Sequence, residues 1–211
     1  MKEYHKIQTI FKRDMATRHK TLIEGEFSAT ELEYLAENLW TFTEKVDGTN
    51  IRVMYQNGKI TFGGKTDAAQ MPAKLVQRLN DVFLPLADLF GTIFTGDVCL
   101  YGEGYGAKIQ KGGGNYRLDQ DFVLFDVRAG EWWLQRCDVE DVASRLGIDV
   151  VPIIGTGTLW DAVILARSGF DSRWGNFTAE GIVARPVVEL KDRGGHRIIT
   201  KIKHRDFALK E

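Results

Sequence analysis

The chain has 211 residues, of which 44% are hydrophobic and 27% charged, a composition typical of a globular protein and not of a disordered or fibrous one. Its 28 basic and 29 acidic residues give a formal net charge of -1, so nucleic-acid binding would need basic residues gathered on one face. The only two cysteines, Cys99 and Cys137, argue against a disulfide scaffold and a cysteine zinc site. No apolar run approaches 18 residues and the polar start lacks an apolar signal core, so we expect a cytoplasmic protein with no membrane span.

Periodic apolar residues and turn signals predict the elements of the first half of the chain. Leu32, Leu35 and Leu39 recur at helical spacing and predict a short helix over 30–39. Asn57-Gly58 between two β-rich runs is a strong hairpin signal. Including a strand at 40–44, the predicted order is helix 30–39, strands 40–44, 51–55 and 59–62, and a helix over 72–89 that Pro85 interrupts.

The second half continues with two strands, two helices and two further strands. Two apolar strands flank a glycine-rich segment, 101–116, which we expect to form a loop. Gly147 is placed to close a helix. The predicted elements are strands 98–101 and 122–127, helices 138–146 and 159–168, and strands 181–184 and 198–202. The sequence therefore predicts one α+β domain over 1–211, with segment 1–40 as a possible peripheral extension.

Five short motifs carry the candidate chemistry, and their order along the chain matters more than any one of them. They are EKVDGTN at 44–50, FGGKTD at 62–67, YGEGYG at 101–106, FVLFDV at 122–127, and the pair AEGIV at 179–183 with ITKIK at 199–203. Taken alone, each reads equally well as a surface turn, a flexible loop or a core strand. Lys201 and Lys203 point to one face of a strand because the side-chain period is two. Paired in this way they could clamp phosphate groups as point charges.

In this order, the motifs resemble those of the covalent nucleotidyltransferase superfamily of polynucleotide ligases and mRNA capping enzymes, over residues 44–203. The KVDGTN form, with GEGYG and FDVR, looks most like the ATP-dependent RNA ligases of the RNA ligase 2-like group, including small phage-encoded members. The resemblance implies a nucleotidyltransferase core, ATP-grasp-like, with antiparallel sheets flanked by helices. It also implies a ligase that joins 5′-phosphate and 3′-hydroxyl RNA ends, and RNA repair as its setting.

The resemblance makes Lys45 the nucleophile that takes AMP from ATP, giving a lysyl-AMP intermediate. A lysine at its ordinary pKa is almost entirely protonated near neutral pH. Lys201 and Lys203 nearby would disfavour a further positive charge, favour the neutral amine of Lys45 and stabilise the pentavalent phosphate. Mg²⁺ or Mn²⁺ would screen the triphosphate, with Glu180 as the carboxylate that helps to hold the metal. AMP would then pass to the 5′-phosphate end, and the 3′-hydroxyl would displace it.

Five further residues receive binding roles from the same resemblance. Glu103 is expected to bond the ribose hydroxyls and Phe125 to stack on adenine. Glu44 matches a residue that contacts the adenine edge in similar ligases. Asp47 is expected to orient the lysine or the ribose, and Asn50 to contact nucleic acid or phosphate.

The chain departs from the family pattern at two places. Similar ligases generally carry arginine where Lys65 stands; lysine keeps the charge for a phosphate or nucleic-acid contact but loses the bidentate fork. Only eight residues follow Lys203, so we expect no C-terminal OB domain. A basic run near the N-terminus consists of Lys6, Lys12, Arg13, Arg18, His19 and Lys20. It could contribute to binding a phosphate backbone, or it could be ordinary solvated surface.

Three readings of function follow from the sequence. The favoured one is an ATP-dependent RNA ligase that acts alone, as a monomer, on RNA ends. The second is a DNA ligase or capping-type nucleotidyltransferase core, which nucleotide selectivity would distinguish. The third is a nucleotide- or RNA-end-binding module without sealing activity. The presence together of Lys45, Glu103, Glu180, Lys201 and Lys203 argues against the third reading, since a decayed enzyme would be expected to lose one of them.

Overall fold

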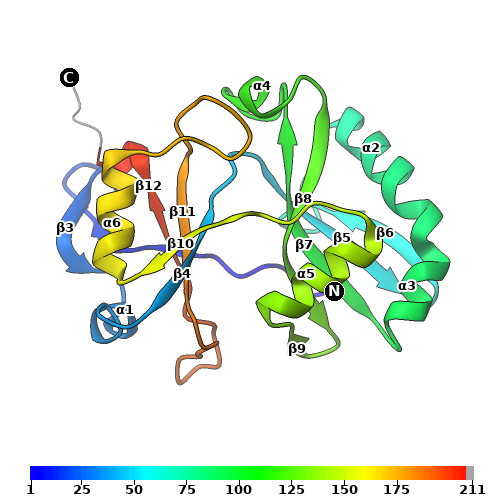
Figure 1. Cartoon of the computed structure of the whole chain (residues 1–211), viewed down its shortest axis with the longest axis horizontal. Helices are drawn as coiled ribbons and strands as arrows, with labels where there is room; N and C mark the ends of the chain where they lie inside the picture. The colour runs from blue at the N-terminus through cyan, green and yellow to red at the C-terminus, as the bar shows by residue number, and fades with distance from the viewer. Residues whose placement is uncertain (208–211) are drawn as a thin grey trace. The chain divides into compact units, whose positions relative to one another are not determined.

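The computed structural model describes residues 1–207 and divides into two compact units, each built on its own five-stranded sheet (Figure 1). Unit 1 consists of Met1–His5 and Asp47–Val151. Unit 2 consists of Lys6–Val46 and the residues from Pro152 on. Among residues 1–207, no helix has the length and apolar character that crossing a membrane requires.

Unit 1 contains an antiparallel sheet in the order β6-β5-β7-β8-β9. Helices α2 and α5 both pack against β8 and bury their apolar sides on one face of this sheet. The strands are β5 (Thr49–Gln56), β6 (Lys59–Gly63), β7 (Val98–Gly106), β8 (Gln120–Ala129) and β9 (Trp132–Trp133). The helices are α2 (Ala73–Phe83), the 3-10 turn η1 (Leu84–Leu86), α3 (Ala87–Ile93), α4 (Gly113–Tyr116) and α5 (Arg136–Leu146).

Local sequence signals explain three features of unit 1. Asn57 and Gly58 both have positive φ, 50° and 73°, as a two-residue turn joining β5 and β6 needs, which confirms the predicted hairpin. Pro85 lies in η1, where α2 gives way to α3, as its missing N–H predicts. The helix predicted over 138–146 is α5, and Gly147 closes it in the left-handed conformation.

Glycines shape β7 in a way that the sequence reading missed. We predicted a loop from Tyr101, but β7 continues to Gly106 and only the later part of the segment leaves the sheet. A Cβ on Gly102 would lie 2.2 Å from the Phe122 ring, and one on Gly104 would lie 2.4 Å from Leu75. These glycines therefore allow close packing against the strand, instead of making it flexible.

Unit 2 contains a sheet in the order β1-β12-β11-β4-β10, antiparallel except for the parallel pair β1 and β12. Helix α6 packs on it and buries Leu159, Ala162 and Ala166 against β4, β11 and β12. The strands are β1 (Gln8–Thr9), β4 (Trp40–Glu44), β10 (Ile153–Gly157), β11 (Gly181–Pro186) and β12 (Thr200–Lys203). The other elements are the hairpin β2 (Phe11–Arg13) and β3 (Leu22–Phe27), α1 (Thr30–Tyr34), α6 (Leu159–Ser168) and the 3-10 turn η2 (His204–Asp206).

The predicted α+β class with antiparallel sheets and flanking helices is confirmed. The predicted strands at 40–44 and 181–184 and the helix at 159–168 correspond to β4, β11 and α6. The helix predicted over 30–39 is shorter and ends at Tyr34, and the last strand begins at Thr200, not at Ile198. Residues of segment 1–40 enter both units. The expectation of one domain with a peripheral extension stays a prediction.

Candidate active site

Three of the predicted residues lie together in unit 2. The ammonium group of Lys45 donates a hydrogen bond to Glu180 Oε2 at 2.5 Å, and that of Lys203 donates to Glu180 Oε1 at 2.7 Å. The three side chains are 19%, 9% and 14% exposed for Lys45, Glu180 and Lys203. One carboxylate thus holds two lysines that are 158 residues apart in the numbering (203 − 45) within a largely buried ion cluster.

Strand pairing explains why these residues meet. Lys45 follows directly on β4, and its backbone N–H donates to Gly181 O at 2.9 Å, at the start of β11. Lys203 is opposite Gly181 in the pairing of β11 with β12. Gly181 has φ 152°, and a Cβ there would lie 2.1 Å from Ile202 O. Glycine at this position therefore lets the two strands approach next to Glu180.

The alternation along β12 confirms the predicted placement of its lysines. Thr200 and Ile202 are buried, whereas Lys201 and Lys203 are partly exposed, so the two lysines share one face of the strand. Lys203 is bound to Glu180. Lys201 lies two residues earlier on the same face, opposite Val183 of β11.

The charges around Glu180 determine its ionisation. Burial of the carboxyl acts to raise its pKa, but the ammonium groups of Lys45 and Lys203 outweigh that effect. The pKa of Glu180 therefore lies below its ordinary value of 4.5, and the carboxylate is ionised at neutral pH.

Glu44, the residue before Lys45, is 1% exposed. Its carboxylate accepts a hydrogen bond from Ser172 Oγ at 2.6 Å and another from the Arg173 N–H at 2.8 Å. Burial raises its pKa, and these two hydrogen bonds and the charge of Arg173 only partly offset the rise. Sequence reasoning missed Ser172 and Arg173, because no motif marks them and they lie more than 120 residues from Glu44.

Unit 1 carries the other predicted residues. Asn50 of β5 and Glu103 of β7 are direct cross-strand partners, which places both at the same level of the sheet. Asn50 Oδ1 is buried with no hydrogen-bond partner among the described residues, so it is an acceptor that a bound donor could satisfy. The backbone N–H of Asp47 donates a hydrogen bond to Tyr116 Oη at 3.1 Å. Lys65 is exposed beyond the end of β6.

Phe125 occupies an irregular position in β8. The pairing of β7 with β8 shifts there, with Tyr101 opposite Asp126 and Gly102 opposite Leu124, so Phe125 is the extra residue of a β-bulge. Tyr4 packs edge-on against the Phe125 ring, with 5.1 Å between ring centres, and donates a hydrogen bond from its hydroxyl to Asp126 Oδ2 at 2.6 Å. The N-terminal segment thus supports Phe125, a contact that the motif itself does not predict.

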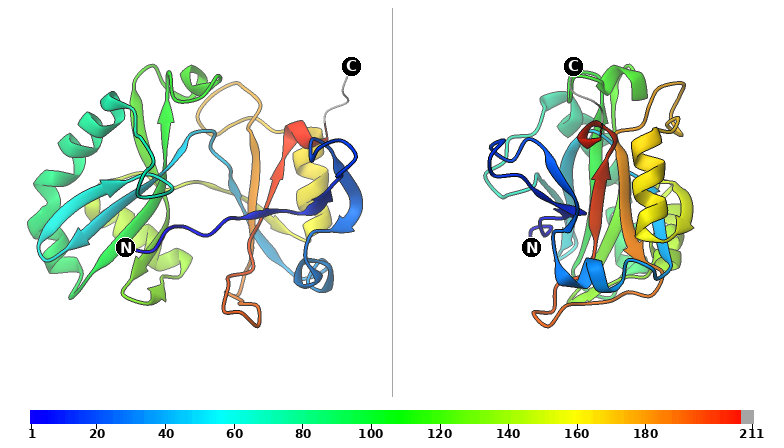
Figure 2. Two further views of the ribbon diagram at one scale, coloured as in Figure 1. Left: turned by 180° about the vertical axis from the view of Figure 1, so that it is seen from behind. Right: turned by 90° about the vertical axis from the view of Figure 1, so that its left-hand side faces the viewer.

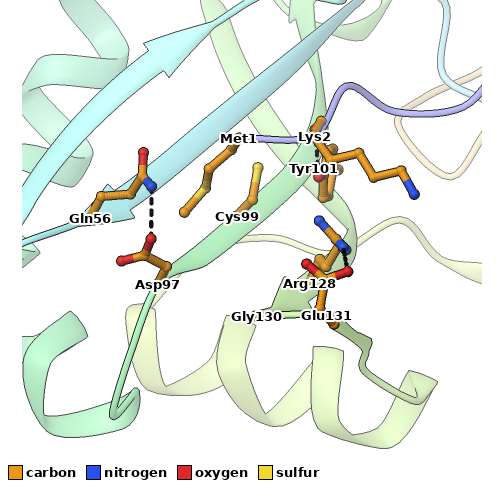
Figure 3. Close-up of a pocket in the computed structure, with 9 residues that line it drawn as sticks. All are labelled: Met1, Lys2, Gln56, Asp97, Cys99, Tyr101, Arg128, Gly130 and Glu131. Carbon is orange, nitrogen blue, oxygen red and sulfur yellow. Dashed lines mark hydrogen bonds and ion pairs between the residues drawn. The ribbon is translucent and has the colours of Figure 1, made fainter.

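A cavity of about 440 Å³ lies on unit 1, beside the first two residues of the chain (Figure 3). Part of its polar lining is already paired, because Arg128 binds Glu131 and Gln56 bonds to Asp97. None of the predicted site residues lines it: the lining is Met1, Lys2, Gln56, Asp97, Cys99, Tyr101, Arg128, Gly130 and Glu131. The cavity is therefore separate from the candidate site.

No group of three or more His, Cys, Asp or Glu side chains within residues 1–207 is placed to hold a metal ion. A divalent ion at this site would need ligands from a bound substrate as well as from the protein. Mg²⁺ commonly binds in this way, through one or two carboxylates together with substrate phosphates.

Comparison with known proteins agrees with the motifs. The family model for RNA ligase matches residues 38–203. Solved structures of Naegleria gruberi RNA ligase variants also match. One of them, with ATP and Mn, superposes at TM-score 0.69 and 15% identity, and the match covers 96% of this chain and 56% of the Naegleria chain. A second, also with ATP and Mn, matches at TM-score 0.66 and 18% identity, covering 83% and 52%. At this identity the likeness concerns the fold, and the chain spans little more than half the length of those proteins.

Proposed function

The chain belongs to the RNA ligase family, and on that premise we propose that it is an ATP-dependent RNA ligase that acts through a covalent AMP on Lys45. The observation that carries the proposal is the cluster of Lys45, Glu180 and Lys203, in which two lysines converge on one carboxylate. The fold it shares with RNA ligases that were solved with ATP and Mn supports it.

In the first step, the neutral amine of Lys45 attacks the α-phosphorus of ATP. A phosphorus–nitrogen bond forms, the bond to the bridging oxygen breaks, and pyrophosphate leaves. The attacking amine must first give up its proton. Lys203 shares the Glu180 carboxylate with Lys45, and Lys201 lies on the same face of β12 as Lys203. The same two lysines offset the negative charge that develops on the phosphate.

The site also suits a divalent ion bound together with the nucleotide. Glu180 supplies a carboxylate that is ionised at neutral pH and only 9% exposed, and the phosphates would supply the remaining ligands. When bound, Mg²⁺ or Mn²⁺ would neutralise part of the triphosphate charge. Exchange of the Lys45 ammonium for the metal at Glu180 would also release the lysine from its ion pair.

The residues of unit 1 recognise the nucleoside in this proposal. Phe125, half-buried and supported by Tyr4, offers a ring for adenine to stack on. Glu103 accepts the ribose hydroxyls, and the unsatisfied Asn50 Oδ1 on the neighbouring strand accepts a further donor from nucleotide or RNA. The resemblance assigns Glu44 to the adenine edge, a contact that requires its carboxylate, 1% exposed here, to be uncovered. Asp47 orients the ribose, and Lys65 contacts a phosphate.

Two later steps complete the reaction. AMP passes from Lys45 to the 5′-phosphate of an RNA end, and the 3′-hydroxyl of the other end then attacks the phosphate and releases AMP. Repair of broken RNA is the role that fits this chemistry. The monomeric state, the cytoplasmic location and the membership of the small phage-type group stay predictions from the sequence.

The test is sealing of RNA whose 5′-phosphate is labelled, presented as a nicked duplex and as a single strand, with matched DNA substrates. With ATP and Mg²⁺ or Mn²⁺, we expect adenylylated RNA followed by sealed RNA. The matched control is Lys45→Ala, which should fail with ATP but still seal RNA that already carries the 5′-adenylate. Binding of RNA ends by the wild type without either product would favour the end-binding module, and transfer from GTP would favour the capping reading.

A further inference from the structure

The hairpin formed by β2 and β3 lies outside residues 38–203, the part that matches the family model. Its tip, residues 14–21, contains Arg18, His19 and Lys20 in succession, and all three are exposed. The structure divides the basic N-terminal run into two kinds of residue. Lys12 is paired with Glu26 and Arg13 with Asp206, so their charges are compensated. Within residues 1–207, Arg18 and Lys20 form no side-chain ion pair or hydrogen bond.

The backbone of the tip is held in one shape by its own hydrogen bonds. The Asp14 N–H donates to Thr21 O at 3.0 Å, and the His19 N–H donates to Asp14 O at 2.9 Å. The hydroxyl groups of Thr17 and Thr21 are 2.8 Å apart, and Arg13 Nη1 donates to His19 O at 3.3 Å. The tip is therefore pre-organised, so that little of the free energy of ligand binding is spent on ordering the loop.

Arg18 and His19 both adopt the left-handed conformation, with φ 55° and 61°. This conformation is uncommon for residues other than glycine, and among the others asparagine, aspartate and histidine adopt it most often, so Arg18 is the less usual of the two. Strained backbone of this kind persists where the surrounding contacts hold it, and it often occurs at functional sites. The side chains of Arg18 and His19, at these two positions, and of Lys20, which follows them, are all exposed.

The base of the hairpin is attached to the strand that carries the site lysines. Thr9 is opposite Lys201 in the pairing of β1 with β12, and the Ile10 N–H donates to Lys201 O at 3.2 Å. Arg13 binds Asp206, three residues after Lys203. Figure 2 shows the hairpin in dark blue beside β12 in red. Because these contacts all lie within unit 2, the tip keeps a fixed position relative to Lys201 and Lys203.

We propose that the tip of this hairpin, through Arg18, His19 and Lys20, binds the phosphate backbone of the RNA substrate. The inference rests on the proposed function and deepens it by assigning a substrate-binding surface. Two permanent cations and an imidazole on a rigid loop suit phosphates that repeat along a strand, and carry no base-specific contact. The tip therefore adds affinity for RNA without selecting a sequence.

The experiment measures binding of a 5′-phosphorylated single-stranded RNA at several salt concentrations, without ATP. The variant is Arg18→Gln with Lys20→Gln. The matched control is Lys59→Gln with Arg193→Gln, which removes the same charge from two exposed residues elsewhere. We expect about tenfold weaker binding for the variant, and a slope of log K against log salt that is smaller by about 1.4, as loss of two single-strand phosphate contacts predicts. The control should change neither quantity beyond the effect of net charge.

Formation of the lysyl-adenylate separates this inference from the proposed function. The variant should take AMP from ATP at the wild-type rate, since neither side chain contacts the Lys45 cluster. Binding and salt slope equal to those of the control would overturn the hairpin proposal. Absence of lysyl-adenylate on the wild type would overturn the proposed function, and the binding measurement would still decide the hairpin, because it needs no ATP.

Discussion

The two units place their candidate residues in different kinds of environment. In unit 2, Lys45, Glu180 and Lys203 contact one another directly, and the cluster is held by charge. In unit 1, Phe125 lies beside the Tyr4 ring, and its surroundings are held by ring packing and by one hydrogen bond to Asp126. Charged contacts respond to pH and to neutralising substitutions, whereas ring contacts respond to loss of apolar area. The difference gives each unit a distinct experimental signature.

Neutralising the carboxylate of unit 2 should have the largest effect. In Glu180→Gln, two mostly buried ammonium groups lose their shared anion, so we expect the free energy of unfolding at pH 7 to fall by about 3 kcal/mol. AMP transfer to Lys45 should fall at least about a hundredfold. Urea unfolding and single-turnover labelling measure the two effects. Glu24→Gln is the control, because Glu24 pairs with Arg167 at the exposed surface and should contribute little.

Wild type and Glu180→Gln should also differ in how their free energy of unfolding depends on pH. The pKa of Glu180 is lower in the folded state than its ordinary value of 4.5. Its contribution to stability is therefore fully present above about pH 4.5 and is lost as the pH falls through the folded-state pKa. The stabilities of wild type and Glu180→Gln should therefore converge in acid. A constant difference from pH 7 down to the acid transition would contradict the assigned role of the charge.

Truncation of the aromatic residue in unit 1 should affect binding more than chemistry. Phe125→Ala should raise the ATP concentration for half-maximal labelling about tenfold, in the range that loss of base stacking gives, with a smaller change in the maximal rate. Phe125→Tyr should keep most of the affinity. Single-turnover labelling over a series of ATP concentrations checks both. A loss confined to the maximal rate would show that the ring acts on something other than the nucleotide.

The contact that supports Phe125 should have a smaller effect. Tyr4→Phe keeps the ring but removes the hydroxyl that donates to Asp126, a carboxylate that is 0% exposed. We expect the free energy of unfolding to fall by about 1–3 kcal/mol, the cost of leaving a buried polar group without its hydrogen-bond partner. Tyr34→Phe is the control, because Tyr34 is 85% exposed. Equal stability of the two variants would mean that the Tyr4 hydroxyl contributes nothing.

The smallest effect belongs to Lys65, an exposed residue where similar ligases carry arginine. Lys65→Arg keeps the charge and adds the bidentate fork, so sealing activity should stay within about threefold of wild type or rise. Initial rates of sealing measure this. A large loss of activity would show that Lys65 does not occupy the position that the motif assigns to it.

Local patterns in the sequence predicted the features that local physics determines. Asn57-Gly58 predicted its hairpin because only certain residues accept positive φ at both positions. The alternation in β12 predicted the shared face of Lys201 and Lys203. Glycines were harder to interpret. Gly102 and Gly104 allow close packing of Phe122 and Leu75, and a sequence does not distinguish that role from loop flexibility.

Long-range contacts explain what the sequence could not predict. Arg52 alternates with Ile51 and Val53 and would be expected on a solvated face, yet it is fully buried, with hydrogen bonds to Gly64 O and Asp67. Ser172 meets Glu44 only because β11 pairs with β4. Such residues belong to no motif, so only the fold identifies them.

The most direct test of the central claim is transfer of label from α-labelled ATP to the denatured protein, followed by mapping of the modified peptide. Our account predicts label on the peptide that contains Lys45, from ATP and not from GTP, in the presence of Mg²⁺ or Mn²⁺. Lys45→Ala should take no label. Label on another residue, or no label on protein that intact mass shows to be free of AMP, would contradict the covalent mechanism.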